Sequence, residues 1–289
     1  MRKKLLGKEW IFENFLSGES KLGLEGFAVK KTLYVEKSKY QMIEIVETDG
    51  FGRMLFLDNL VQLSTKHEAI YHEMLVHPAM LSHPAPKKVL ILGGGDGGAL
   101  REVLKHPVKE VFLVDIDEDV IEASKKYLPS VSHSAFKDPR AKVIVADGEE
   151  FISRYNEYFD CIIFDLSDPD NEISLKMFHR RFFEKAKKAL KSSGIFSGQT
   201  GYLTEEFSEA AIKELRRVFP HVVVRKAYVG SFREGEQSFS LAAKKLKIAT
   251  IPLATIRRRF EKTKLKTVYY SPEIHMASAV LPRYMSEKS

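Results

Sequence analysis

The segment Val89-Leu-Ile-Leu-Gly-Gly-Gly-Asp-Gly-Gly98 leads from four apolar residues into a glycine-rich turn, and a helical pattern follows it. Gly93, Gly95 and Gly98 satisfy the G-x-G-x-x-G spacing, and Asp115 ends the next apolar run about 20 residues further on. A strand, a turn that lets the backbone approach a ligand, and an acidic residue for ribose hydroxyls together predict a nucleoside-binding βαβ unit. A tight glycine turn without a ligand would explain only one of these three features.

Strand-like and helical patterns alternate on the C-terminal side of this turn. Apolar runs at 110–114, 142–145 and 160–164 have the composition of buried strands, and helical patterns lie between most of them. This alternation is typical of a mostly parallel sheet flanked by helices, so we expect an α/β, Rossmann-like fold. Further units are expected beyond it: helices near 181–191 and 205–218, and strands near 194–197, 222–224 and 238–242.

The chain before the glycine turn has a different pattern. Short apolar or alternating runs at 27–29, 32–35, 42–46, 54–57 and 60–63 are expected to be strands, and turn signals such as Asp49-Gly50 and Asp58-Asn59 separate them. We therefore expect a small antiparallel β domain over residues 1–65 and a Rossmann-like domain that carries the chemistry over 66–289. The second domain should begin with a helix near 68–81.

Length and composition exclude several classes of protein. The chain has 289 residues, 44% of them hydrophobic, which is enough for a substantial core. No apolar run approaches the roughly 20 residues that span a bilayer. The N-terminus has no apolar signal-peptide core, so we expect a cytoplasmic protein with no membrane partner. The single cysteine, Cys161, lies in an apolar run and is expected to be a small buried hydrophobe.

The formal net charge of +7 raises the question of a nucleic-acid partner. The densest basic stretch, 244–266, is interrupted by an apolar segment and contains no recognisable nucleic-acid-binding motif. A solvated helix face is the better interpretation, and we expect no nucleic-acid partner. A basic nucleic-acid-binding module with a vestigial nucleoside fold is kept as the non-enzymatic alternative.

Acidic residues stand where strands of the expected sheet end. Asp96 lies in the glycine turn, and Asp165 and Asp168 follow the run at 160–164. Ligands of open α/β sheets bind at the carboxyl ends of strands, so these three carboxylates should meet in one crevice. Taken alone, the second pair is better explained as a turn before Pro169, but its position after a parallel strand favours a site.

The charge of Asp96 bears on the ligand. A pyrophosphate beside this carboxylate would be repelled, so a dinucleotide is disfavoured, whereas an adenosyl sulfonium with a nearby ammonium suits it. S-adenosylmethionine brings an ammonium and a carboxylate to this loop, and its decarboxylated form brings only the ammonium. Asp147 and Gly148, at the end of the strand at 142–145, either read the adenine or form a plain turn.

Two other chemistries are unsupported. His72 and His77 are one residue too far apart for the zinc-binding H-E-x-x-H pattern and do not share a helix face, so no metal site is expected. The G-x-S-x-G elbow of serine hydrolases is absent from the sequence.

Four stretches together resemble the polyamine aminopropyltransferases, the spermidine synthase family. They are Ile70-Tyr-His-Glu-Met74, Leu92-Gly-Gly-Gly-Asp-Gly-Gly98, Val114-Asp-Ile-Asp117 and Asp165-Leu-Ser-Asp168-Pro169, and the similarity extends over about 10–281. The resemblance implies a small N-terminal β domain on a Rossmann-like domain, assembled as a homodimer or homotetramer. It also implies transfer of an aminopropyl group from decarboxylated S-adenosylmethionine to an amine, releasing 5′-methylthioadenosine. Decarboxylated S-adenosylmethionine is then a co-substrate, and neither a cofactor nor a metal is expected.

The resemblance also assigns roles to individual residues. Asp165 matches the family's proton acceptor, and Asp96 and Asp165 match the pair that holds the aminopropyl ammonium. Positions around the methylthioadenosine group are matched by Gln41, Asp115, Asp147 and Gly148. Positions near the acceptor amine are matched by Tyr71, His72, Asp168 and Gln199. Without the resemblance, burial in a helix or strand would be the better interpretation of Gln41, Tyr71, His72 and Gln199.

The chemistry agrees with these roles, because an alkylammonium must lose a proton before its nitrogen can attack, and a carboxylate can both attract it and accept that proton. The sequence departs from the family pattern at three places. Residues 170–173 lack the usual Gly-Pro loop, whose proline touches the nucleoside. Towards the acceptor, Phe232 stands where a tyrosine is typical, and His67 where an aspartate is. The expected acceptor is putrescine or a longer or guanidinylated amine, such as agmatine or a triamine. The alternative within this fold is an S-adenosylmethionine-dependent small-molecule methyltransferase.

Overall fold

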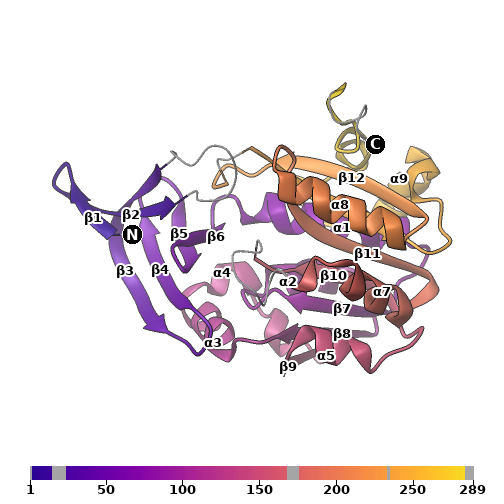
Figure 1. Cartoon of the computed structure of the whole chain (residues 1–289), viewed down its shortest axis with the longest axis horizontal. Helices are drawn as coiled ribbons and strands as arrows, with labels where there is room; N and C mark the ends of the chain where they lie inside the picture. The colour runs from indigo at the N-terminus through magenta and orange to yellow at the C-terminus, as the bar shows by residue number, and fades with distance from the viewer. Residues whose placement is uncertain (1, 15–23, 168–175, 233–234, 284–289) are drawn as a thin grey trace.

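Two β-sheets divide the chain between them in the computed structural model, which describes residues 2–14, 24–167, 176–232 and 235–283 (Figure 1). The N-terminal sheet has six strands in the order β1-β2-β3-β4-β5-β6, and every neighbouring pair is antiparallel. The second sheet has seven strands in the order β12-β13-β11-β10-β7-β8-β9.

The N-terminal sheet is an antiparallel meander, as the sequence predicts. Its strands are β1 (Arg2–Leu5), β2 (Lys8–Asn14), β3 (Leu24–Lys37), β4 (Met42–Thr48), β5 (Gly52–Leu57) and β6 (Leu60–Ser64). The turn between β5 and β6 places Asp58 and Asn59 at φ of 49° and 68°, the left-handed pair that a two-residue hairpin requires. The strands β1 and β2 were not predicted, and β3 was predicted as two separate strands. The pairing of β3 with β4 shifts register twice, which interrupts the alternating pattern within one continuous strand.

The larger sheet is mostly parallel and is flanked by helices, which confirms the predicted Rossmann-like class. Its parallel strands are β7 (Lys88–Gly93), β8 (Glu110–Asp115), β9 (Ala141–Val145), β10 (Phe159–Asp165) and β11 (Leu190–Tyr202). An antiparallel hairpin-like edge is added by β12 (His221–Tyr228) and β13 (Glu236–Ala243). The helices are α1 (Glu68–Ser82), α2 (Gly98–Leu104), α3 (Glu118–Tyr127), α4 (Pro129–Ser132), α5 (Gly148–Ser153), α7 (Arg180–Ala189), α8 (Glu206–Val218), α9 (Leu253–Thr263) and α10 (Pro272–Ala277).

Both faces of the parallel sheet are buried. Along β7, Val89 and Ile91 pack into one apolar cluster with α1, α2 and α9, whereas Leu90 and Leu92 pack into a second, phenylalanine-rich cluster with α5, α7 and α8. Successive side chains of a strand point to opposite faces, so an uninterrupted apolar run is what a strand covered on both sides requires. Among the helices that the structure describes, none is long and apolar enough to cross a membrane.

The two sheets meet through an apolar contact. Ile45 and Leu55 of the N-terminal sheet pack against Val120 of α3 and Val131 of α4. Arg53 adds a hydrogen bond of 2.6 Å from its guanidinium to the carbonyl of Tyr127. This contact fixes the N-terminal sheet beside the carboxyl ends of β7 and β8, where the sequence predicts the ligand.

Candidate active site

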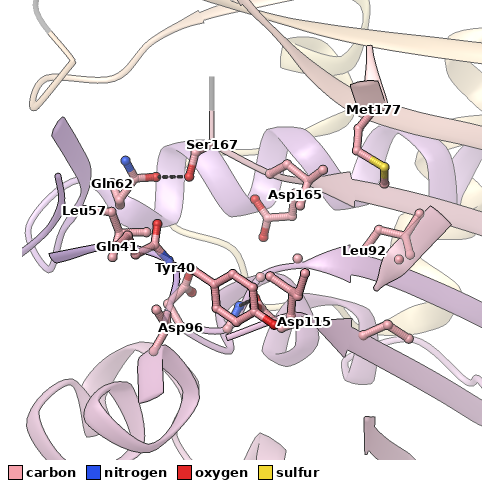
Figure 2. Close-up of a pocket in the computed structure, with 18 of the residues that line it drawn as sticks. Tyr40, Gln41, Leu57, Gln62, Leu92, Asp96, Asp115, Asp165, Ser167 and Met177 are labelled. Carbon is pink, nitrogen blue, oxygen red and sulfur yellow. Dashed lines mark hydrogen bonds between the residues drawn. The ribbon is translucent and has the colours of Figure 1, made fainter. Parts of the chain in front are cut away.

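A cavity of about 500 Å³ opens where the carboxyl ends of β7, β8 and β10 face the N-terminal sheet (Figure 2). Its walls come from both parts of the chain, including the β3–β4 loop, β5, α1 and the glycine turn. The ionisable lining is strongly acidic. Its carboxylates are Asp58, Asp96, Asp115, Asp147, Glu149 and Asp165, against a single lysine, Lys176, among the described residues that line it. The protein therefore has an acidic cavity despite its net positive charge, and this cavity suits a cationic ligand.

The glycine turn brings β7 against its neighbour β10. Gly93 pairs with Asp165 in the parallel register, and the amide of Gly94 donates to the carbonyl of Asp165 at 2.9 Å. Gly93 has a φ of 77°, and a Cβ there would lie only 2.2 Å from the carbonyl oxygen of Asp165. Only glycine permits both the left-handed backbone and this approach. The turn thus brings Asp96 close to the residue that ends β10.

Asp96 and Asp165 carry the charge at the centre of the cavity. Asp96 Oδ1 accepts a hydrogen bond of 2.7 Å from the amide of Gly98 and lies 3.3 Å from His72 Nε2. Asp165 Oδ1 accepts a 2.9 Å hydrogen bond from the Tyr71 hydroxyl, whereas its Oδ2 is buried and accepts none from the part of the chain that the structure describes. Burial and the nearby charge of Asp96 raise the pKa of Asp165 to about 7.

Asp115 ends β8 and is held by backbone amides. Its Oδ2 accepts from Gly95 and its Oδ1 from Asp117, both at 2.9 Å. Burial raises the pKa of Asp115 to about 6. Asp117 in turn accepts from the side-chain amide of Gln41 at 2.9 Å. These bonds attach the β3–β4 loop to the glycine turn, and both Gln41 and Asp115 line the cavity (Figure 2).

Asp147 and Gly148 fit both interpretations that the sequence leaves open. Asp147 caps α5 by accepting a 2.9 Å hydrogen bond from the amide of Glu150, as a turn residue would. Both residues also line the cavity, next to Leu92 and Met177. Apolar side chains at this end of an acidic cavity provide a surface on which a purine base can lie.

Two of the predicted substrate-binding residues lie behind the cavity wall. His72 is only 1% exposed, and its Nδ1 faces Glu68 Oε2 at 2.7 Å. Gln199 is 2% exposed, and its side-chain amide donates to the carbonyl of Leu166 at 2.8 Å. Each therefore contacts a residue that does line the cavity, Asp96 or Leu166. Tyr71 lines the cavity directly. Asp168, the last of this group, falls outside the described residues.

The lining also contains residues that were not assigned to the site from the sequence, among them Tyr40, Gln62 and Ser167. The Ser167 hydroxyl donates to Gln62 Oε1 at 2.9 Å and so joins the N-terminal sheet to the end of β10 (Figure 2). Tyr40 is next to Gln41, which was a usable signal. No pattern in the sequence connects Gln62 with Ser167, because their contact depends on how the two sheets are placed.

His72, Asp96 and Asp165 each bring an atom within 4.8 Å of the others, a grouping that could in principle hold a metal ion. Both ring nitrogens of His72 face carboxylates, one of Glu68 and one of Asp96. A metal ion at this grouping would have to displace one of these carboxylates from the ring.

The fold is Rossmann-like, and its acidic cavity lies at the carboxyl ends of the parallel strands, where enzymes of this fold bind their ligands. A family model for the spermine/spermidine synthase domain matches residues 68–251, and one for the spermidine synthase tetramerisation domain matches 15–65. The chain belongs to the spermidine synthase family, which confirms the resemblance, and it is an aminopropyltransferase.

Individual relatives agree with this family. The polyamine aminopropyltransferase of Shouchella clausii is 41% identical over 262 residues, covering 90% of this chain and 92% of the relative, and that of Bacillus subtilis is 40% identical with the same coverage. A spermidine synthase crystallised with the transition-state analogue AdoDATO superimposes with a TM-score of 0.90 at 33% identity, covering 100% of this chain and 96% of that one. The spermidine synthase from Thermotoga maritima gives 0.88, also at 33% identity, with coverages of 100% and 95%. The alternative of a small-molecule methyltransferase is not favoured.

Proposed function

We propose that this enzyme transfers the aminopropyl group of decarboxylated S-adenosylmethionine to a di- or polyamine and releases 5′-methylthioadenosine, with Asp165 as the proton acceptor. The observation that carries this proposal is Asp165, a carboxylate that lines the acidic cavity and whose buried Oδ2 accepts no hydrogen bond from the described part of the chain. A carboxylate in that position needs a cation or a proton, and an alkylammonium substrate supplies both.

The cavity divides into regions that suit the parts of the co-substrate. We place the adenine beside Asp147, Gly148 and Met177, and the ribose beside Asp115 and Gln41. The aminopropyl ammonium then reaches Asp96 and Asp165. The carboxylate of intact S-adenosylmethionine would meet this same acidic group, and its repulsion favours the decarboxylated form over a methyl donor.

The reaction is a single displacement at carbon. The acceptor amine gives up a proton to Asp165, and its lone pair attacks the aminopropyl carbon bonded to the sulfonium. A C–N bond forms, the C–S bond breaks, and its electron pair returns to sulfur as the neutral thioether. A carboxylate with a pKa of about 7 is a far better base than an exposed aspartate, whose pKa is near 4. The walls of the cavity increase the rate further by holding the attacking nitrogen, the carbon and the sulfur in line.

Features near Asp165 support the choice of acceptor. The ring of Phe232 packs edge-on against Tyr71 with centroids 5.8 Å apart, and it offers no hydroxyl to a distal amine. We propose that the acceptor is putrescine or a longer or guanidinylated amine, with Tyr71, His72, Asp168 and Gln199 at its end of the site. His72 and Gln199 would act there through Asp96 and Leu166.

The assembly and setting of the enzyme extend this proposal. The match of residues 15–65 to a tetramerisation domain supports a homodimer or homotetramer of chains built from domains 1–65 and 66–289. We further propose that the enzyme is cytoplasmic, that decarboxylated S-adenosylmethionine is a co-substrate in a reaction without cofactor or metal, and that nucleic acid is not a partner.

One assay tests the function. The protein is incubated with decarboxylated S-adenosylmethionine and, separately, putrescine, cadaverine, agmatine, spermidine or norspermidine, and 5′-methylthioadenosine is measured. We expect release with at least one amine and none with intact S-adenosylmethionine. If no amine gives release of 5′-methylthioadenosine, the proposal is wrong. If the protein instead transfers a methyl group from intact S-adenosylmethionine, it is a methyltransferase.

A further inference from the structure

A line of buried charges leads away from the cavity behind Asp96. Arg101 of α2 donates two hydrogen bonds to the carboxylate of Glu68 on α1, from Nη1 to Oε1 at 2.9 Å and from Nη2 to Oε2 at 2.8 Å. Glu68 Oε2 contacts His72 Nδ1 at 2.7 Å, and His72 Nε2 lies 3.3 Å from Asp96 Oδ1. Negative and positive groups therefore alternate from the cavity into the protein interior.

Neither Glu68 nor Arg101 lines the cavity, and both are largely buried. A buried ion pair costs desolvation energy that an apolar pair would not, so its presence beside a substrate site calls for a reason. The two-point geometry fixes the Glu68 carboxylate in one orientation. That orientation directs its Oε2 at the ring of His72.

Asp96 and Asp165 are two carboxylates that lie close together beside the ring of His72. Oxygens of Asp96 and Asp165 come within 4.8 Å, and such a pair cannot readily hold two negative charges. A cationic His72 beside Asp96 stabilises the negative charge on Asp96 rather than on Asp165. Asp96 stays an anion that binds the substrate ammonium, and Asp165 is left to gain and lose the proton.

We propose that Glu68 and Arg101 are positioning residues for the transfer: Arg101 holds Glu68, Glu68 holds His72 as an imidazolium against Asp96, and Asp165 is thereby selected as the proton acceptor. This inference rests on the proposed function for its role in catalysis. The protonation of His72 does not depend on it and can be measured separately.

The electrostatic effects of the surrounding groups agree with the geometry. Burial acts to lower the pKa of His72, but Asp96 and Glu68 outweigh it and raise that pKa well above its usual value. Burial likewise acts to raise the pKa of Asp96, and His72 reverses this and lowers it. Arg101 also acts to lower the pKa of Asp96. At Asp165, the hydrogen bond from Tyr71 acts to lower the pKa and the charge of Asp115 acts to raise it.

The first test observes His72 itself. The imidazole ¹⁵N shifts of the intact protein are followed from pH 5 to 9, and the His72 signal is identified by its absence from His72→Gln. In the native protein we expect His72 to remain an imidazolium at pH values where a free imidazole is neutral. In Glu68→Gln its transition should move down by about one pH unit or more. A native His72 that titrates near pH 6.5 would overturn the proposal, whether or not the enzyme transfers aminopropyl groups.

The second test uses the pH profile of kcat/KM. In Glu68→Gln a larger fraction of His72 is neutral at a given pH, so Asp165 keeps its proton to higher pH. The acidic limb of the profile should therefore shift upward by up to about one pH unit, which is up to a roughly tenfold loss of kcat/KM at pH values below the limb. Glu73→Gln is the matched control: Glu73 is a buried carboxylate of the same helix, but it accepts only backbone amides, those of Val268, Tyr269 and Tyr270. Glu73→Gln should lower the stability of the protein and leave the acidic limb of the kcat/KM profile at its native pH. If the acidic limb of the kcat/KM profile lies at the same pH in Glu68→Gln and Glu73→Gln, Glu68 has only a structural role.

Arg101→Lys separates charge from placement. Lysine keeps the positive charge but cannot make both hydrogen bonds to the Glu68 carboxylate. We therefore expect kcat to fall about 3–10-fold, while the acidic limb of the kcat/KM profile stays near its native pH. A native kcat in Arg101→Lys would remove Arg101 from the proposal. If Glu68→Gln does not fold, this variant and the native His72 titration still decide the outcome.

Discussion

Asp165 combines a function with an energetic cost. Its pKa is raised from the ordinary value near 4 to about 7, so the folded protein binds more protons than the unfolded chain between these values. Stability contributed by this residue is therefore complete at low pH and decreases as the pH rises through 7. The same buried charge that destabilises the fold makes Asp165 a base of useful strength.

Asp165→Asn should separate the two effects. The amide cannot accept the amine's proton, so we expect kcat to fall by about 10²–10⁴-fold at pH 8. The variant should also be more stable than the native protein at pH 8, by on the order of 2 kcal/mol, and equally stable near pH 4. Thermal unfolding at both pH values and a 5′-methylthioadenosine assay measure these outcomes. Turnover that survives at the native rate would refute Asp165 as the base.

At the scale of single elements, the β7 turn depends on glycine for a reason that can be measured. Gly93→Ala introduces a Cβ 2.2 Å from the Asp165 carbonyl at a φ of 77°. We expect it to destabilise the protein by roughly 3 kcal/mol or more, with loss of activity, because β7 and β10 must move apart. Gly7→Ala is the control, since Gly7 has a similar φ of 74° with nothing within 4 Å of the added Cβ.

The control should cost about 1 kcal/mol, the strain of the backbone alone, and should keep full activity. Urea unfolding measures both variants. If Gly93→Ala is no worse than Gly7→Ala, the close approach of the two strands is not what the glycine serves.

The elements that the sequence predicts best are those whose pattern is local. The parallel strands appear as apolar runs because both their faces are buried, and α1 and α8 lie within one or two residues of the expected helices. The N-terminal strand β1 was missed because its side chains are mostly charged and exposed, so no apolar run marks it. β2 was missed although it contains the short apolar run Trp10-Ile-Phe12. β3 was divided because its two register shifts interrupt the alternation.

At the scale of the whole molecule, prediction depended on strand order. Asp96 and Asp165 share a cavity because β10 lies directly beside β7, a neighbour relation that alternation of strands and helices does not specify. The positions of His72 behind Asp96 and of Gln199 behind Leu166 are likewise products of packing. Residue types and spacing indicated the chemistry of the site, whereas contact between its parts required the structure.

The bond between Gln62 and Ser167 is the contact that most directly joins the two sheets across the cavity. If it fixes the N-terminal wall against the end of β10, Gln62→Ala and Ser167→Ala should each lower kcat/KM about 3–10-fold, and the double variant should be little worse than either. A double-mutant cycle on kcat/KM should then give a coupling energy of about 0.5–1.5 kcal/mol. Ser153→Ala on α5, whose hydroxyl bonds only within its own helix, is the control and should combine additively with Gln62→Ala. Additive losses for Gln62 and Ser167 would mean that each acts on the substrate separately and that the wall is held by other contacts, namely the apolar contact with α3 and α4 and the bonds of Arg53 and Gln41.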